Sequence, residues 1–433
     1  MRRWLQDEHF RSLLKNSGYL AASKAVAGVT GFITLALAGR SLGVATFGML
    51  ILVASYAQAV GGIAKFNSWQ VVVLYGSPAI ERGDLHTFRR ATDFAVGLDL
   101  VSGLVALAGS LLILPFVSQT FGIPPQYVAY ALIYCLLVPT MGSAFTGVLR
   151  AFDRFDLLSW QGTIQPNLRA VLAAIGWWQG YGFDYFFAIW FVTDVIAALA
   201  TFLFARRELK RHSVGRIRPS LSARDLPNGW RYAINVNVNS TVSTSWGPVG
   251  RLLIGGLLDA ASAGLYRVAS SVADAVQKPT ILLTKALYPQ LLRLDPRTKA
   301  PWRLLFRVIV SSGLLSLLLI LVAALFGEWV LAAAFGAEFI GAYKVLLILL
   351  GASLFSLVSF PMPPMLESLG RIGIPTAANI AGAIAYLAAF YPLTTSFGLV
   401  GAGLAFLIGK LVVTIYMTAV LASERERLHR DNP

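Results

Sequence analysis

Long apolar segments recur along the whole of this 433-residue chain. A helix that crosses the hydrocarbon of a bilayer needs about 20 mostly apolar residues in a row. Hydrophobic residues make up 56% of the sequence and charged residues only 13%, and this supply suffices for about twelve such helices. A transmembrane barrel would show alternating segments of about ten residues instead. The sequence therefore predicts an all-α polytopic membrane protein.

The predicted spans form two groups of six, separated by a basic connector. We expect an N-terminal six-helix lobe at 1–210, a cytoplasmic connector at 211–229, and a C-terminal six-helix lobe with a short cytoplasmic tail at 230–433. The spans are predicted at 17–42, 47–74, 92–117, 127–149, 158–179, 185–205, 230–258, 263–287, 304–326, 343–366, 375–392 and 399–422.

Two short motifs recur at almost the same offset. The stretch LGVATFGML begins at Leu42, and its relative LDAASAGLY begins at Leu258, 216 positions later. LRAFDR at Leu149 returns as LESLGR at Leu366, offset by 217. In the first pair a small turn segment joins two apolar segments, which predicts a membrane hairpin with a tight elbow. A duplicated half-chain of about 216 residues explains both echoes and predicts two pseudo-symmetric six-helix bundles.

Basic residues concentrate in alternate segments between the spans. The formal net charge is +15, and the stretch 206–231 alone contains eight Lys and Arg, whereas 118–126, 179–184 and 392–398 contain none. Because short cytoplasmic loops carry the excess of Lys and Arg, both termini are predicted to be cytoplasmic. The positive charge therefore sets membrane topology, and nucleic-acid binding is not expected.

Five cations fall within predicted spans, where a charge near the bilayer centre costs about 2.5–3.5 kcal/mol. If all five faced lipid the cost would be roughly 12–17 kcal/mol, so they should face acids, one another or a water-filled cavity. Three acids also lie in spans, which leaves a positive excess able to attract an anionic headgroup. The cations are Lys24, Lys65, Arg169, Arg251 and Lys410, and the acids are Asp99, Asp194 and Asp274.

Helical spacing groups polar residues on shared faces. Gln161, Gln165 and Arg169 follow one another by one turn on the fifth span, and Gln58, Gly62, Lys65 and Trp69 do so on the second. The first span places Lys24 in a strip of small residues, which is also how membrane helices pack. Lys410 either serves function or forms a structural pair with an intramembrane acid.

The seventh span is crowded with amides and hydroxyls between Asn235 and Ser245, including Asn239. Such a segment suits a wet, interrupted helix able to contact sugars or a diphosphate. Proline is common near other spans, where it either kinks a helix or is simply packed. The cluster Pro361, Pro363 and Pro364 is harder to explain by packing.

The sequences LAGRSLGVATFGML, RLLIGGLLDAASAGLYRVA and GVLRAFDRFDLL resemble those of the polysaccharide flippases. These are the O-antigen and exopolysaccharide repeat-unit translocases of the multidrug/oligosaccharidyl-lipid/polysaccharide exporter superfamily. The resemblance implies that the two bundles surround a central cavity, which spans one, two, seven and eight line and whose opening alternates between the membrane faces. It implies a site for the lipid diphosphate at Lys24, Lys65 and Arg251, with Asn235, Asn239 and Asp274 nearby; we add Arg169 from its polar face.

The resemblance also implies the cargo, an undecaprenyl-diphosphate-linked oligosaccharide moved from the cytoplasmic to the outer leaflet of the bacterial inner membrane. Its destination would be O-antigen, capsule or exopolysaccharide, with polysaccharide polymerase or export machinery as partner. The sequence has no Gly-rich P-loop, so direct use of ATP is not expected. An H⁺ or Na⁺ gradient or the membrane potential would drive transport, with Asp274 or Asp194 as ion-coupling residue.

Several alternatives compete with this interpretation. A cation-coupled drug antiporter of the same superfamily needs an acid in the first span, where this chain has Lys24. A membrane glycan polymerase or ligase needs a large outer loop, which is not predicted. The lipid II flippase resembles a fourteen-span design rather than twelve. We expect no enzymatic activity, cofactor or metal, because the four His are scattered and the single Cys135 lies in an apolar run.

Overall fold

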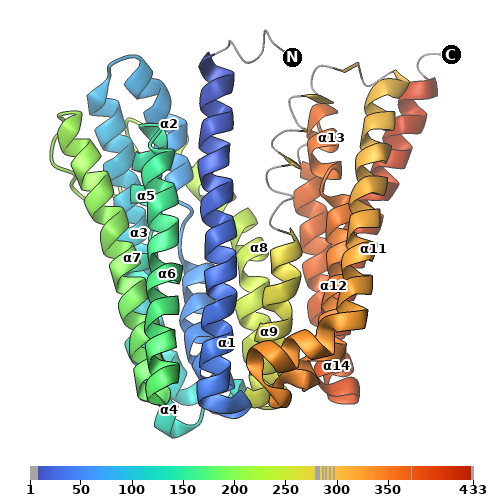
Figure 1. Cartoon of the computed structure of the whole chain (residues 1–433). Coiled ribbons are helices and arrows are strands. Elements are labelled where there is room, and N and C mark those ends of the chain that lie inside the picture. Colours follow the sequence, from blue (N-terminus) through green and yellow to red (C-terminus); the bar gives the residue numbers. More distant parts are fainter. Residues whose placement is uncertain are drawn as a thin grey trace. The chain divides into compact units, whose positions relative to one another are not determined.

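The computed structural model describes residues 8–277, 283–284, 287, 290–291, 294–295, 298–371 and 373–430, and its regular elements within these ranges are all helices (Figure 1). This confirms the predicted all-α architecture. Seven of the described helical stretches are long and apolar enough to cross a membrane. Two of them, α1 and α14, contain a non-helical glycine and so comprise two helices each.

The chain divides into two compact units, Met1–Gly256 and Leu257–Pro433. The helices of the first unit are α1 (Glu8–Ala64), α2 (Trp69–Glu81), α3 (Leu85–Val117), α4 (Pro125–Cys135), α5 (Ala144–Ala151), α6 (Phe155–Gln179), α7 (Phe183–Arg211) and α8 (Gly229–Leu257). Those of the second are α9 (Ala260–Gln277), α11 (Lys299–Phe335), α12 (Tyr343–Ser359), α13 (Met362–Ser368) and α14 (Gly373–Arg430).

Both predicted elbows are present, but they are built differently. In α1 the chain turns at Gly43, whose φ of 71° and ψ of 167° interrupt the helix. Glycine tolerates this positive φ because it has no Cβ. In the echo, α8 ends at Leu257 and Asp259 caps α9, accepting a hydrogen bond from the Ser262 amide at 2.6 Å. The predicted elbow, a short turn between two helices, is therefore present at both positions.

The second echo has the same backbone geometry in both halves. The Arg154 amide donates to the Leu149 carbonyl at 2.8 Å, and the Arg371 amide donates to the Leu366 carbonyl at 2.8 Å. The residues before these arginines, Asp153 and Gly370, have φ of 56° and 78°. Both are Schellman turns, which close a helix by satisfying its last carbonyls. The two halves thus share this turn in structure as well as in sequence.

Short non-α-helical linkers break the second and fourth predicted spans, so the helical face predicted to be shared by Gln58, Gly62, Lys65 and Trp69 does not form. The first break separates α1 from α2 at 65–68. The second separates α4 from α5 at 136–143 and contains the 3₁₀ turn Val138–Met141. Pro139 contributes to that break, since proline has no amide hydrogen to donate to the preceding turn. Lys65 therefore lies in a linker rather than on a helical face.

Proline acts differently in two other spans. The tenth span is interrupted at Pro361, between Ser359 and Met362, and the other two prolines of the cluster follow at the start of α13. By contrast, α8 continues through Pro248, so the seventh span is a continuous helix. One missing helical hydrogen bond bends a membrane helix without ending it when neighbouring groups satisfy the freed carbonyl.

Apolar packing is concentrated inside each unit, and apolar side chains also cover much of the outside. The first unit has a core around Val72, Phe88 and Phe94, and the second has one around Met365 and Leu366. Leu112 and Phe116 of α3 are 71% and 85% exposed, and α11 exposes many of its leucines. Such surfaces are expected of helices that face lipid tails.

Candidate functional site

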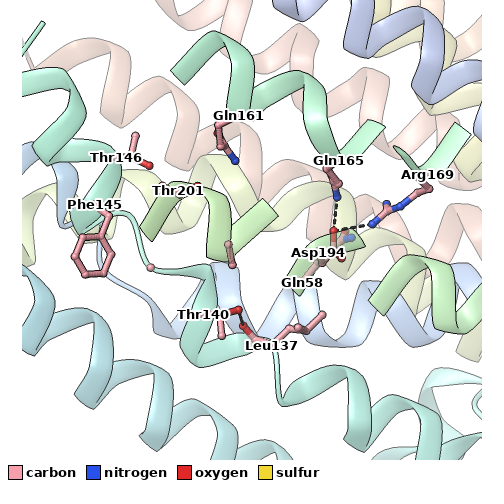
Figure 2. Close-up of a pocket in the computed structure, with 12 residues that line it drawn as sticks. Gln58, Leu137, Thr140, Phe145, Thr146, Gln161, Gln165, Arg169, Asp194 and Thr201 are labelled. Carbon is pink, nitrogen blue, oxygen red and sulfur yellow. Dashed lines mark hydrogen bonds and ion pairs between the residues drawn. The ribbon is translucent and has the colours of Figure 1, made fainter. Parts of the chain in front are cut away.

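An ion pair between α6 and α7 forms the polar centre of the first unit (Figure 2). Arg169 Nη2 donates to Asp194 Oδ1 at 2.6 Å, and Gln165 Nε2 donates to the same oxygen. The Tyr134 hydroxyl of α4 donates to Oδ2. The guanidinium also donates to the Thr193 hydroxyl at 2.8 Å and lies over the Trp190 ring. The carboxylate thus accepts hydrogen bonds on both oxygens.

A pocket of about 360 Å³ opens beside this pair. Its wall is mostly amide, hydroxyl and charged groups, although the surrounding helices are apolar. The predicted stripe of the fifth span lines it, which confirms that these side chains share a face. The lining residues are Gln58, Leu137, Thr140, Gly142, Phe145, Thr146, Gln161, Gln165, Arg169, Asp194, Ala198 and Thr201.

Arg251 lies next to the α1 side of this pocket. It is 7% exposed, and its Nε donates to Ser55 at 2.7 Å while Nη2 donates to Gln58 at 3.0 Å. Gln58 is itself a pocket residue. Two of the predicted headgroup cations, Arg169 and Arg251, are therefore connected to one polar pocket.

A second buried charge centre joins the two helix breaks. Asp99 of α3 accepts a hydrogen bond from the Ser68 hydroxyl at 2.6 Å and one from the Ala144 amide at 2.9 Å. Lys65 lies close enough to Asp99 for electrostatic attraction and is 9% exposed. A headgroup could touch this ammonium only if the break opened.

The second unit contains a related pair. Asp274 of α9 and Lys410 of α14 attract each other electrostatically, and Lys410 also lies over the Phe406 ring. The same 216-residue offset relates Asp194 to Lys410 and Gln58 to Asp274. Each of the three intramembrane acids is thus close to one of the predicted cations, and this pairing lowers the cost of placing charge in the membrane.

The remaining predicted site residues belong to α1 and α8. The side chain of Lys24 is exposed on α1, and that of Asn235 is exposed on α8. Asn239 belongs to α8, but its side chain lies outside the described part of the structure. The positions of Lys24 and Asn235 leave their predicted contacts with a headgroup untested.

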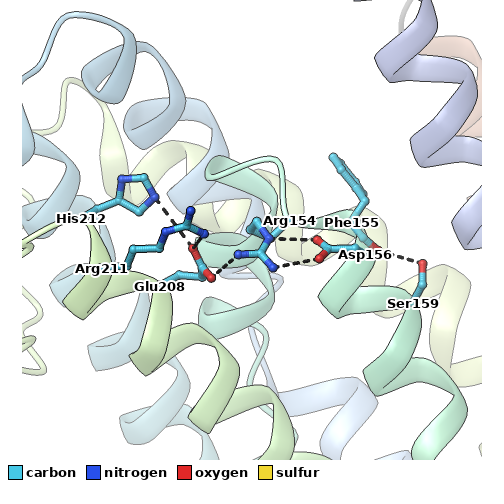
Figure 3. A network of polar contacts seen from close by, with 7 residues as sticks. All are labelled: Arg154, Phe155, Asp156, Ser159, Glu208, Arg211 and His212. Carbon is cyan, nitrogen blue, oxygen red and sulfur yellow. Dashed lines mark hydrogen bonds and ion pairs between the residues drawn. The ribbon is translucent and has the colours of Figure 1, made fainter.

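A charged cluster that sequence reasoning missed lies at the end of α7 (Figure 3). Arg154 forms an ion pair with Glu208, whose side chain is 2% exposed, and donates two hydrogen bonds of 2.9 and 2.8 Å to the Asp156 carboxylate. These bonds hold the pKa of Asp156 below its ordinary value and raise the pKa of Arg154. Arg211 and His212 approach the other Glu208 oxygen at 3.8 Å.

The second unit repeats the core of this cluster. Arg371 bonds Glu424 at 2.6 Å, and Arg427 approaches that carboxylate at 4.0 Å. Glu208 and Arg211 correspond to Glu424 and Arg427 at an offset of 216. The recurrence of Glu-x-x-Arg at this offset was the available sequence signal. In each half, this glutamate forms an ion pair with the arginine that ends the shared Schellman turn.

Comparison with known proteins shows the family to which the chain belongs. The family model described as polysaccharide biosynthesis protein matches residues 13–295, more than half of the chain. The chain belongs to the polysaccharide biosynthesis protein family. This family member is also 35% identical to the inner membrane protein YghQ of Escherichia coli K12 over 350 residues, covering 80% of this chain and 99% of YghQ. The resemblance to polysaccharide flippases seen in the sequence is confirmed at the level of the family.

Solved structures confirm the fold of this polysaccharide biosynthesis protein. An inward-facing multidrug resistance MATE family transporter of the MOP superfamily aligns with a TM-score of 0.72 at 15% identity, covering 95% of this chain and 96% of that one. The lipid II flippase MurJ, in an inward closed conformation, aligns with a TM-score of 0.67 at 11% identity, covering 93% and 87%. The chain is therefore a polytopic membrane protein with the fold of that superfamily.

Proposed function

We propose that this protein flips an undecaprenyl-diphosphate-linked oligosaccharide across the bacterial inner membrane for surface polysaccharide synthesis. The observation that carries the proposal is the polar pocket of the first unit, in which the Arg169 guanidinium lies among amides and hydroxyls. The pocket lies in a member of the polysaccharide biosynthesis family whose fold resembles that of the lipid II flippase.

The chemistry of the pocket fits a phosphorylated sugar. The planar guanidinium of arginine binds phosphate oxygens through paired hydrogen bonds. Gln161 and Thr201 offer the amide and hydroxyl groups that suit sugar hydroxyls. A volume of about 360 Å³ lies at the lower end of the range for small-molecule pockets, so the pocket suits the headgroup while the lipid chain stays outside.

Asp194 gives this binding site a coupling mechanism. In the ionised state it competes with phosphate for Arg169, because both are anions that accept bonds from the same guanidinium. Protonation of Asp194 removes that competitor and leaves Arg169 charged. We therefore propose Asp194 as a proton-coupling residue, because its charge decides whether Arg169 is available to phosphate. Asp274, beside Lys410, is proposed as the coupling acid of the second unit.

The remaining parts of the proposal concern topology and further contacts. We infer cytoplasmic termini from the distribution of Lys and Arg, and we propose that the lobes 1–210 and 230–433 rearrange to expose the cargo alternately. Lys24, Asn235 and Asn239 are proposed as additional headgroup contacts, and the polymerase or export machinery as the partner that receives the flipped lipid.

Reconstitution into liposomes tests the proposal. Undecaprenyl-diphosphate oligosaccharide is placed in both leaflets, and the fraction reached by an added lectin is followed over time with and without a pH gradient. The expected result is faster equilibration than in protein-free liposomes, with loss of transport in Arg169→Met. Equal rates in empty and protein-containing liposomes, together with pH-driven efflux of a cationic dye, would establish the drug antiporter instead.

A further inference from the structure

Each end of the break in the fourth span, at 136–143, is held by a different intramembrane carboxylate. On the α4 side, the Tyr134 hydroxyl donates to Asp194. On the α5 side, the Ala144 amide donates to Asp99 at 2.9 Å. Tyr134 belongs to the last turn of α4, and Ala144 is the first residue of α5. The angle between these two half-helices therefore depends on two acids.

Asp99 holds two half-helices at once. Its Oδ1 accepts from the hydroxyl of Ser68, the residue before α2, and its Oδ2 accepts from the first amide of α5. A carboxylate is favoured at helix N-termini, where unpaired amides create a positive end. The approach is close enough that a Cβ on Gly142 would lie 2.5 Å from Asp99 Oδ2, so this contact requires glycine at 142.

Lys65 supplies the opposite charge. Asp99 is 7% exposed and Lys65 is 9% exposed, and the Lys65 ammonium has no hydrogen-bond partner among the described residues. A buried ammonium is costly unless an anion compensates it. Because Asp99 provides that compensation, a change in the charge of Asp99 alters the energy of the whole cluster.

A pocket leads to this carboxylate. It measures about 370 Å³ and is lined by Asp99, Pro139 and Gly142, with apolar residues of α3 and α7 such as Leu100 and Phe202 around them. The charged group facing Asp99 is Lys65, from the linker between α1 and α2, and the polar groups are the Ser68 hydroxyl and the backbone amides of Ser143 and Ala144. The α7 wall of the pocket is apolar.

We propose that Asp99 is a proton-binding site that controls the helix break of the fourth span. The ionised carboxylate accepts bonds from both half-helices, whereas the protonated acid gains a donor and loses an acceptor position. Proton uptake at Asp99 then releases Ser68 or Ala144 and leaves Lys65 without its counter-charge. The result is a loosened break next to the Arg169 pocket, because Thr140 and Gly142 of the break line both that pocket and the one beside Asp99. This site is distinct from Asp194 and does not depend on which lipid is carried.

The single cysteine of the chain reports on this break without engineering. Cys135 is buried and is the last residue of α4. The purified full-length protein is labelled with a maleimide between pH 5.5 and 8.5, and each rate is divided by the rate of the denatured protein at the same pH. This division removes the intrinsic pH dependence of the thiol. Labelling of a transiently opened segment follows the population of the open state.

The expected result is a normalised rate that rises as the pH falls in the wild type. Asp99→Asn, which resembles the protonated acid, should label about tenfold faster at high pH, as expected from the loss of one hydrogen bond to a charged acceptor. Its rate should depend on pH less steeply than that of the wild type, because Asp194 still holds the α4 side of the break. Ser68→Ala removes one of the two bonds and should show an intermediate increase, which keeps the test informative if Asp99→Asn folds poorly.

Asp184→Asn is the control, because Asp184 also accepts a bond within the first unit, from Tyr130, but that bond joins α4 to α7 away from the break. It should label like the wild type. A wild-type rate that is flat with pH, or an Asp99→Asn rate equal to that of the wild type, overturns the proposal. Neither result bears on lectin-detected transport, so failure here is distinguishable from failure of the flippase function.

Discussion

Asp194→Asn should strengthen the binding of diphosphate to the resting protein. In the wild type, Asp194 and an incoming phosphate compete for Arg169, which is bound to the carboxylate at 2.6 Å. The two side chains are only 14% and 22% exposed, so solvent screens the pair weakly. A hydrogen bond to a charged group contributes about 1.5–3 kcal/mol, and asparagine keeps the shape but not the charge.

The lower end of that range corresponds to about a tenfold change in affinity. We therefore expect inorganic diphosphate to bind Asp194→Asn at least tenfold more tightly than the wild type at pH 8. Isothermal titration calorimetry on detergent-purified protein measures this difference.

Two controls isolate the competition. Arg169→Met should lose diphosphate binding, because the guanidinium is the proposed phosphate ligand. Asp184→Asn removes another Tyr–Asp bond between α4 and α7 and should leave the affinity unchanged. If Asp194→Asn is folded, as judged by its thermal unfolding, but binds diphosphate no better than the wild type, the ion pair is structural and the coupling mechanism is wrong.

Two further predictions concern stability, measured as thermal unfolding in detergent. Glu208→Gln should destabilise the first unit by about 3 kcal/mol, because removing one partner of a buried ion pair leaves the other charge buried and unpaired. Glu424→Gln should cost about 1 kcal/mol, because its partner Arg371 is 43% exposed. Equal losses of stability in the two variants would contradict this ranking. Gly43→Ala should cost about 1–2 kcal/mol through its positive φ, and an unchanged unfolding temperature would show that the elbow tolerates a Cβ.

The sequence determined the class and the plan of this protein. Apolar segments of spanning length, basic residues in alternate connections and two echoes at one offset predicted a helical membrane protein with a repeated half. The physical reason is that these features are local or periodic. A bilayer requires apolar helices of a given length, and a turn such as Leu149 to Arg154 depends on residues within it. Gln161, Gln165 and Arg169 shared a face for the same reason.

The tertiary structure decided how the charges pair and where the helices break. The sequence showed that intramembrane cations and acids need partners, but not that Arg169 bonds Asp194 or that Lys65 lies beside Asp99. Those pairings join residues more than 20 positions apart in different elements, and helical periodicity relates only residues on one helix. The break at 65–68 had no local signal comparable to Pro139. It is stabilised instead by Asp99, on another helix, which accepts a hydrogen bond from the Ser68 hydroxyl.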